Sequence, residues 1–165
     1  MKQKSLLVLV GPPGCGKTTW ADKFAEENNA LHVSRDRIRF SLIKENNGYF
    51  SKEDKVFKIF CDTIRKGLDS DEYDYVIADA THLNQVGRYK LLSSISYTPD
   101  INLIAVEFHT PLDVCLSRNN LREGRACVPV AVVRRMFSSF VSAKNDENYH
   151  FNEIWSVNEK GELTK

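Results

Sequence analysis

The chain has 165 residues, of which 42% are hydrophobic and 27% are charged, so it can bury the core of one ordinary domain. Its net charge of +1 argues against a protein that coats nucleic acid by bulk charge, while a local grip on one end of a strand stays open. The four cysteines lie far apart and form no CxxC pair, so we expect neither a disulfide framework nor a zinc site.

The sequence carries no pattern typical of a membrane or secreted protein. Its apolar runs are shorter than the roughly 20 residues that a helix needs to span a bilayer. The run that ends at Gly11 is also too short for the apolar region of a signal peptide with its cleavage site. Together with the dispersed cysteines, this pattern predicts a cytoplasmic protein with no membrane partner.

Strand and helix patterns alternate along the chain. Continuous apolar runs predict buried parallel strands, and apolar residues that repeat every three to four positions predict helices. In chain order, the expected elements are strand 6–10, helix 17–27, strand 31–33, helix 34–43, loop 44–51, helix 56–68, strand 75–79, helix 85–94, strand 101–108, a helix from 111 to a break at 123–125, helix 129–143 and strand 150–157. This order predicts an α/β fold with a parallel sheet of about five strands and helices on both faces, in a single domain over residues 1–165.

A phosphate-binding loop follows the first predicted strand. It matches the pattern GxxxxGK[ST] in full, and Thr19 extends it into the helix; its residues are Gly11, Pro12, Pro13, Gly14, Cys15, Gly16, Lys17 and Thr18. The glycines let backbone N–H groups point at the phosphates of a nucleotide, and the helix that follows adds its positive dipole end. We expect Lys17 to reach the β- and γ-phosphates and the Thr18 hydroxyl to ligate magnesium. The loop therefore predicts binding of ATP, or another nucleoside triphosphate, with Mg²⁺.

A phosphate loop alone is common to ATPases, GTPases and kinases. A GTPase would need an Asn-Lys-x-Asp base-recognition element, which the sequence lacks. A motor or AAA-type ATPase normally has a longer core and a hydrophobic strand that ends in paired acids, whereas the third predicted strand ends in a single acid, Asp79. Asp79 either supports magnesium and orients Thr18 or caps the loop at Thr81 or His82. The chain length and the late arginines favour a small kinase with a lid.

Arginines are concentrated late in the chain, where residues 118–135 hold a single acid, Glu123. The five arginines of this segment are Arg118, Arg122, Arg125, Arg134 and Arg135. Arginine presents a planar fork of donors suited to phosphate. Since Arg118 and Arg122 share one face at the end of a predicted helix, we expect an arginine-rich lid over about residues 118–129 that neutralises charge on the transferring phosphoryl group. The alternative is a pair of cations that suit a helix C-terminus.

A second arginine stretch carries Asp36 and Arg39 three residues apart at the start of a predicted helix, so the two side chains share a face. They directly follow the second predicted strand, and ligands of open α/β sheets bind beyond the carboxyl ends of strands. We therefore expect Asp36 to act as a base beyond the γ-phosphate, with Arg39 and Arg37 as anchors for phosphate on the acceptor. The alternative is a surface ion pair of little energetic value.

Four motifs occur in the same order as in the 5′-hydroxyl polynucleotide kinase domains of bacteriophage and bacterial end-repair enzymes, and the chain resembles that family from about residue 4 to residue 140. The motifs are Gly-x-Pro-Gly-x-Gly-Lys-Thr-Thr-Trp-Ala, Ser-Arg-Asp-x-x-Arg, Ala-Asp-Ala-Thr-His-Leu-Asn and Arg-Asn-x-x-Arg-x-Gly-x-x-x-Val-Pro. The second and fourth motifs are far more specific than the phosphate loop. The resemblance implies a P-loop kinase-like fold and transfer of the γ-phosphoryl from ATP to a 5′-hydroxyl end of DNA or RNA.

The resemblance also implies roles for individual residues. Asp36 matches the acid that accepts the proton of the 5′-hydroxyl, and Arg39 matches the residue that holds the 3′-phosphate of the terminal nucleotide. Arg118 and Arg122 match lid arginines that clamp the donor phosphates. Val128 matches an apolar contact at the mouth of the acceptor pocket.

Three departures from the family pattern bear on the acceptor. Arg37 stands where the relative compared most closely has a second acid, the lid is one residue longer, and the length leaves no room for that relative's phosphatase domain. The expected catalytic residues remain Lys17, Asp36 and Arg122. The acceptor is a nucleic-acid 5′ end or, alternatively, a small hydroxyl compound such as a nucleoside, sugar or antibiotic. Outside enzymes, the alternative is a nucleotide-binding regulatory module, and the oligomeric state stays open.

Overall fold

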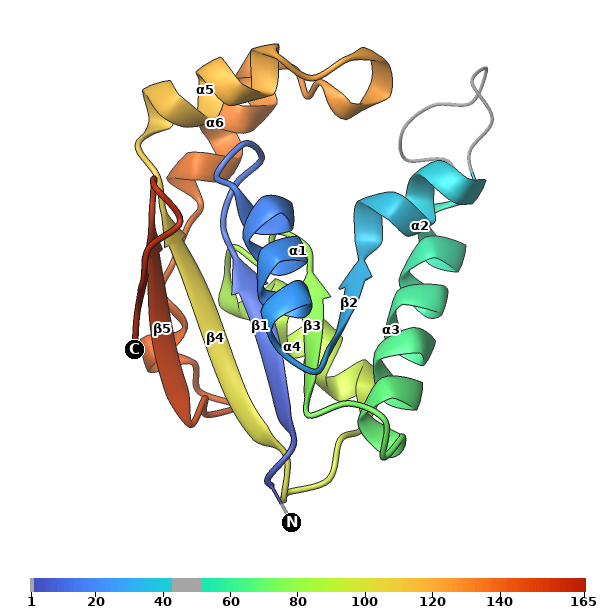
Figure 1. Ribbon diagram of the computed structural model, residues 1–165. Coiled ribbons are helices and arrows are strands. Elements are labelled where there is room, and N and C mark those ends of the chain that lie inside the picture. Colours follow the sequence, from blue (N-terminus) through green and yellow to red (C-terminus); the bar gives the residue numbers. More distant parts are fainter. Residues whose placement is uncertain (1, 43–51) are drawn as a thin grey trace.

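The computed structural model describes residues 2–42 and 52–165, apart from the Arg125 side chain, and shows a twisted sheet with helices on both faces (Figure 1). Within those ranges the sheet has six strands in the order β2-β3-β1-β4-β5-β6, of which the first five run parallel and β6 runs antiparallel to β5. The strands are β1 Ser5–Val10, β2 Ala30–Ser34, β3 Tyr75–Asp79, β4 Asn102–His109, β5 Glu153–Asn158 and β6 Leu163–Thr164. The α/β fold class that the sequence predicts is confirmed.

The helices cover the two faces of the sheet in separate groups. They are α1 Lys17–Glu27, α2 Arg35–Leu42, α3 Glu53–Asp69, α4 Gln85–Ile95, α5 Leu112–Asn120 and α6 Val130–Ser138, with 3₁₀ turns η1 Gly124–Ala126 and η2 Ala143–Asn145. Helices α3 and α4 pack on one face, and α1, α5 and α6 contribute to the core on the other. The carboxyl ends of β1, β2 and β3 point toward α2 and the α5–α6 region, which lie at the same end of the molecule (Figure 1).

Strand β1 lies at the centre of the core, and all six of its residues are buried. Successive side chains of a strand point to opposite faces. Leu6 therefore packs with Phe60 of α3 and Leu91 of α4, while Leu7 packs with Trp20 of α1 on the other side. Burial on both faces explains why this strand reads as an unbroken apolar run rather than an alternating pattern.

Helix α6 ends at Ser138 rather than at the predicted Ala143, which is the main correction to the predicted elements. Beyond the helix, the Val141 N–H donates to the Leu83 carbonyl oxygen at 2.8 Å. The Ala143 N–H donates to the buried Glu107 carboxylate, also at 2.8 Å. These tertiary hydrogen bonds take the donors that a longer helix would have used for its own backbone, so the segment leaves the helical path.

Other boundaries differ only slightly from the prediction. Pro111 and Pro129 serve as N-caps, and the helices begin one residue later. The sequence does not predict β6, because two residues are too few to leave a pattern. The predicted loop over 44–51 lies outside the described residues. None of the helices in the described ranges is long and apolar enough to cross a membrane.

A buried ion pair ties α4 to the segment after η2. Arg88 has no exposed surface, and its guanidinium donates from Nε and from a terminal nitrogen to the Asp146 carboxylate at 2.6 and 2.8 Å. A third bond runs to the His82 carbonyl oxygen at 2.9 Å. Because the charge is fully enclosed, removing one partner would leave the other without compensation.

We expect Arg88→Ala to lower the free energy of unfolding by about 3 to 5 kcal/mol, since it leaves Asp146 buried and unpaired. Urea unfolding followed by circular dichroism measures the change. The control is Lys2→Ala, which removes an exposed ion pair with Asp74 and should cost about 0.5 kcal/mol or less. A loss at Arg88 no larger than the loss at Lys2 would contradict the prediction.

Candidate active site

The phosphate loop connects the carboxyl end of β1 to α1. Gly14 and Gly16 have φ angles of +80° and +97°, in the left-handed region that L side chains rarely adopt. A Cβ at Gly14 would lie only 2.4 Å from the Cys115 carbonyl oxygen of α5. The loop therefore needs glycine there both for its turn and for its packing. Helix α1 begins at Lys17, directly after Gly16, so its unpaired N–H groups lie at the loop.

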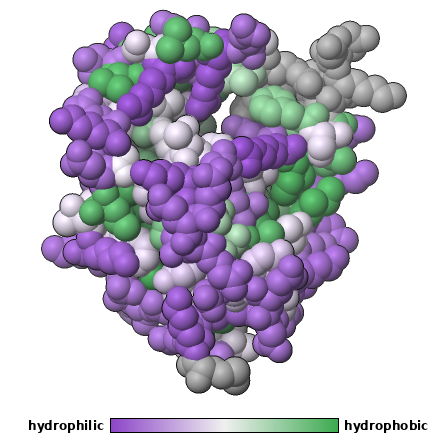
Figure 2. All heavy atoms as spheres, in the orientation of Figure 1, coloured by the Kyte–Doolittle hydropathy of each residue, from purple (hydrophilic) through white to green (hydrophobic). Residues whose placement is uncertain are grey.

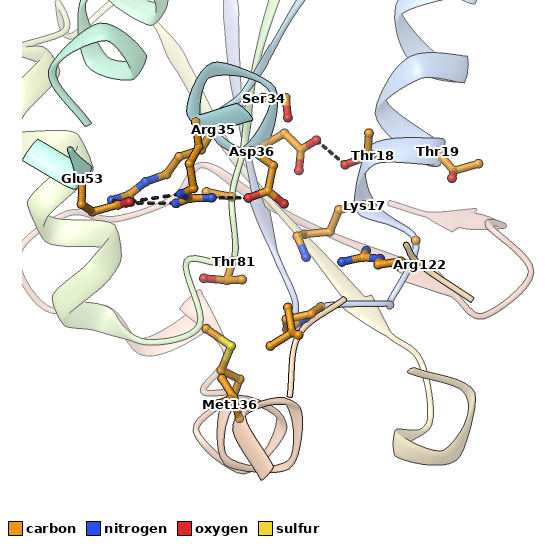
Figure 3. Close-up of a pocket in the computed structure, with 17 residues that line it drawn as sticks. Lys17, Thr18, Thr19, Ser34, Arg35, Asp36, Glu53, Thr81, Arg122 and Met136 are labelled. Atoms are coloured by element: carbon orange, nitrogen blue, oxygen red, sulfur yellow. Dashed lines mark hydrogen bonds and ion pairs between the residues drawn. The ribbon is translucent and has the colours of Figure 1, made fainter. Parts of the chain in front are cut away.

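Lys17 lies over its own loop. Its Nζ donates to the carbonyl oxygens of Gly11 at 2.9 Å and Pro12 at 3.0 Å. The side chain lines the same cleft as Asp36 and Arg122, and Figure 3 shows the three converging from different elements. The three residues that the sequence predicts to be catalytic are thus brought together, although they are far apart in the chain.

Thr18 and Asp79 meet where the carboxyl ends of the parallel strands lie. The Thr18 hydroxyl donates to Oδ2 of Asp79 at 2.8 Å, and the Asp79 side chain is 4% exposed at the carboxyl end of β3. Of the two alternatives for Asp79, its contact with Thr18 favours the one in which it orients that hydroxyl. His32 of β2 lies against the same oxygen, with Nε2 at 2.8 Å, and its Nδ1 lies 3.0 Å from Oδ1 of Asp22.

The donor set at this edge fits the magnesium ion that the phosphate loop implies. A hydroxyl and a carboxylate are oxygen donors of the kind that Mg²⁺ prefers. In the part of the chain that the structure describes, there is no group of three or more His, Cys, Asp or Glu that could hold a metal. Mg²⁺ does not require one, since it is commonly bound through one or two protein oxygens, phosphates and water. Thr18 and Asp79 are therefore the residues that would support it.

Four charged side chains form the other wall of the cleft, and Figure 3 labels three of them, Arg35, Asp36 and Glu53. Arg39 donates from Nε and a terminal nitrogen to Glu53 at 3.1 and 3.0 Å, and also donates to Asp36. Arg35 pairs with the same Glu53 carboxylate. The Arg39 side chain is only 6% exposed, whereas half of the Asp36 side chain is accessible. The predicted acceptor anchor is thus already held between two carboxylates.

Glu53, the first residue of α3, is a residue of this wall that the sequence did not point to. Burial pushes the pKa of its carboxyl group upward, but hydrogen bonds and charges from Arg39 and Arg35 outweigh burial and hold the pKa below its ordinary value. No local pattern links it to Asp36, because the two lie on different helices. Only the packing of α3 beside α2 brings them together.

Arg37 does not line the cleft with Arg39, contrary to the expectation that both face the acceptor. Its guanidinium donates to both carboxylate oxygens of Asp22 on α1, at 3.0 and 2.8 Å. The hydrogen bond from Arg37 lowers the pKa of Asp22, and the contact with His32 adds to this effect. Side chains two positions apart on a helix point in different directions, so Arg37 and Arg39 reach different partners.

The lid runs from α5 through η1 to α6. Asn119 is buried at the end of α5, donates to the Val128 carbonyl oxygen at 2.6 Å and accepts from the Val128 N–H at 3.0 Å. These two bonds close the loop between the helices, and both Arg122 and Val128 line the cleft. Arg118 instead lies beside the phosphate loop and donates to the Glu159 carbonyl oxygen at 2.6 Å. Asn119 belongs to the lid motif, but its role was not foreseen.

The cleft between the loop, the lid and α2 has a volume of about 280 Å³. In Figure 2 the hollow opens between the lid at the top and α2 on the right, and mostly hydrophilic side chains surround it. The lid adds apolar contacts from Val128, Val132 and Met136. The predicted nucleotide-binding residues that line it are Pro13, Gly16, Lys17, Thr18, Thr19 and Arg122.

His82, which follows β3 in the loop beyond Asp79, is a structural residue. Its ring is buried, and Nδ1 lies 2.9 Å from the Leu9 carbonyl oxygen. Burial lowers the pKa of His82 to about 4, so the ring is neutral at physiological pH. Its neighbour Thr81 lines the cleft and accepts a backbone hydrogen bond from the Gly11 N–H at 2.9 Å.

Comparisons with known proteins identify relatives over most of the chain. A family model described as "AAA domain" matches residues 6–142. Transcription factor bHLH140 of Arabidopsis thaliana is 29% identical over 157 residues, which are 90% of this chain and 16% of that protein. Adenylate kinase 2 of Schistosoma mansoni is 36% identical over 74 residues, which are 40% of this chain and 31% of that protein. The matches thus span less than a third of either relative.

Solved structures share the fold at low identity. An unliganded sugar kinase from Janibacter sp. HTCC2649 has a TM-score of 0.64 and 16% identity, with 95% of this chain and 86% of that chain covered. A fungal RNA kinase has a TM-score of 0.67 and 18% identity, with 98% and 39% covered. At these identities the likeness shows the P-loop kinase fold alone. The matched family is described as "AAA domain", although β3 ends in the single acid Asp79 and not in the paired acids expected of an AAA-type motor.

We expect Glu53→Gln to lower the free energy of unfolding at neutral pH by about 2 kcal/mol, because it weakens charged hydrogen bonds to Arg39 and Arg35. The folded pKa of Glu53 lies below the unfolded value, so its stabilisation is present above the unfolded pKa and is lost as the pH falls through the folded pKa. The difference between wild type and variant should therefore shrink as the pH falls from neutral into the acid range in which Glu53 becomes protonated.

Urea unfolding of both proteins across this pH range measures the difference. Glu26→Gln, at an exposed position on α1, is the control and should differ little from wild type throughout. A Glu53→Gln deficit that stays constant from neutral to acid pH would show that the ionised pair is not its source.

Proposed function

This chain is a member of the AAA-domain family, and we propose that it is a kinase that binds ATP with Mg²⁺ and transfers the γ-phosphoryl group to a hydroxyl acceptor. The observation that carries the proposal is the convergence of Lys17, Asp36 and Arg122 on one cleft beside a complete phosphate loop. Phosphoryl transfer depends on positioning and on charge stabilisation. The cleft offers the cation of Lys17 on the donor side, the guanidinium of Arg122 from the lid and the accessible carboxylate of Asp36 opposite them.

The roles of these residues follow from where they lie. The loop N–H groups and Lys17 bind the donor phosphates, and Arg122 stabilises the charge that develops on the transferring group. Asp36 accepts the acceptor hydroxyl proton while the hydroxyl oxygen bonds to the γ-phosphorus, and the bond from that phosphorus to the bridging oxygen breaks to release ADP. Thr18 and Asp79 would hold Mg²⁺, which would neutralise phosphate charge when bound.

For the acceptor we propose a 5′-hydroxyl end of DNA or RNA. Three features support it: the Ser-Arg-Asp-x-x-Arg and lid motifs of the polynucleotide kinase resemblance, the place of Arg39 beside Asp36 in the cleft, and a fungal RNA kinase among the similar folds. Arg39 would hold the 3′-phosphate of the terminal nucleotide, and Val128 would contact its apolar part. An acceptor phosphate must then compete with Glu53 for Arg39.

That competition also supports a second candidate, a small neutral hydroxyl compound such as a sugar. Arg39 and Arg35 are already paired with Glu53 and Asp36, so two cations face two carboxylates and the wall is close to neutral. A neutral acceptor could bind there without displacing an ion pair. The sugar kinase among the similar folds points the same way.

Incubation with γ-labelled ATP and Mg²⁺ tests the proposal on four acceptors: an oligonucleotide with a 5′-hydroxyl end, a nucleoside 3′-monophosphate, the plain nucleoside and a panel of sugars. Label on the oligonucleotide supports the first candidate, and label on sugars alone supports the second. ATP binding without transfer to any acceptor would identify a regulatory module instead.

We expect Lys17→Ala to abolish this transfer, since it removes the cation that faces the β- and γ-phosphates. Its circular dichroism and unfolding transition should match those of wild type, because the hydrogen bonds of the side chain in the described part of the chain run to its own loop, to the Gly11 and Pro12 carbonyl oxygens and the Cys15 sulfur. Wild-type transfer activity in this variant would show that the phosphate-loop assignment is wrong.

The two arginines at the cleft should respond differently to the acceptor. Arg122→Ala should slow transfer to every acceptor by a similar factor, roughly 10³-fold, because it acts on charge at the γ-phosphate. Arg39→Ala should reduce kcat/KM mainly for the nucleoside 3′-monophosphate and much less for the plain nucleoside. Arg122→Lys should recover only part of the rate, since an ammonium lacks the guanidinium fork.

Comparing kcat/KM for each variant on the two matched acceptors separates the two roles. If Arg39→Ala weakens both acceptors equally, Arg39 does not anchor an acceptor phosphate. The small-acceptor candidate would then be preferred.

A further inference from the structure

His32 occupies a position that the proposed mechanism does not yet use. It lies on β2, and its side chain is 7% exposed between Asp79 of β3 and Asp22 of α1. One ring nitrogen is 2.8 Å from Asp79 Oδ2, and the other is 3.0 Å from Asp22 Oδ1. The ring thus connects the carboxylate beside the phosphate loop to a carboxylate on the neighbouring helix.

We propose that His32 is a positioning residue that fixes the Asp79 carboxylate, and through it the Thr18 hydroxyl, in the orientation needed to support Mg²⁺ bound with ATP. The proposal rests on the nucleotide-binding part of the proposed function and adds a residue to it. It does not depend on the identity of the acceptor.

The direction of the hydrogen bonds supports this role. A carboxylate only accepts, so the Thr18 hydroxyl donates to Oδ2 of Asp79, and His32 donates to the same oxygen in the protonation states that carry a proton on Nε2. Since the single hydroxyl proton of Thr18 is directed at Asp79, the lone pairs of its oxygen are left for a cation. Two donors from different elements also restrict rotation of the carboxylate more than one donor would.

The outer partners hold the ring in turn. Asp22 faces Nδ1, and the Arg37 guanidinium donates two hydrogen bonds to the Asp22 carboxylate, at 3.0 and 2.8 Å. Carboxylates behind histidines commonly fix ring orientation at metal sites, and loss of such outer partners costs about 10- to 100-fold in metal affinity or activity. Here the histidine is itself the outer partner, and Asp22 stands one step further out.

Isothermal titration of ATP, with Mg²⁺ and separately with EDTA, tests the proposal on the full chain. His32→Leu removes the ring nitrogens that face Asp79 and Asp22 and replaces the ring with an apolar side chain of similar size. It should weaken ATP binding in Mg²⁺ by about 10- to 100-fold and leave binding in EDTA unchanged. His32→Gln keeps an N–H donor that can reach Asp79 and should restore most of the lost affinity.

Arg37→Ala is the matched control. It removes an exposed side chain that contacts Asp22 and lies 3.4 Å from His32 Nδ1. The contact between His32 Nε2 and Asp79 stays in place, so the variant should weaken binding in Mg²⁺ less than twofold. The proposal is overturned if His32→Leu binds ATP as wild type does, if it loses affinity equally with and without Mg²⁺, or if His32→Gln is no better than His32→Leu.

A measurement on wild type covers the case in which His32→Leu does not fold. In ¹⁵N NMR spectra of the ATP complex, addition of Mg²⁺ should shift the His32 Nε2 resonance, because its acceptor is the carboxylate that supports the ion. An unmoved resonance overturns the proposal. Failure of the proposed kinase function has a different signature, which is intact Mg²⁺-dependent ATP binding with no transfer to any acceptor.

Discussion

The hydrogen bond from Thr18 to Asp79 is the contact on which the arrangement of the cleft depends. It joins the first turn of α1 to the carboxyl end of β3, the neighbour of β1, so the phosphate loop and the sheet edge hold each other in place. Because the Asp79 side chain is buried, its oxygens need partners from the protein. His32 supplies one from β2, so two adjacent strands and the first turn of α1 meet at one polar contact above an apolar core.

The two walls of the cleft are built on different principles. The donor wall is a local structure, in which eight consecutive residues and the helix that follows them create a site for phosphates. The acceptor wall is a balanced set of charges from α2 and α3, in which Arg39 and Arg35 share Glu53. The two arginines and two carboxylates leave this wall close to neutral.

The lid connects the two walls. The side chain of Asn119 bonds both backbone groups of Val128, which keeps the loop between α5 and α6 closed over the cleft. Arg122 extends from this loop toward the donor side, while Val128 faces the cleft beside it. Arg118, the other arginine of the lid motif, donates instead to the Glu159 carbonyl oxygen just beyond β5. One short segment thus serves both walls.

The sequence by itself determined the phosphate-loop pattern and the α/β order of elements, because each depends on local spacing or on a run of apolar side chains. It also predicted Lys17, Asp36 and Arg122 as site residues, from local spacing and from the family motifs. Only the tertiary structure decided the partners of these residues. Glu53 and His32 carry no local pattern, since their contacts come from elements distant in the chain. For the same reason the end of α6 was misplaced, because the backbone there bonds to Leu83 and Glu107 instead of to itself.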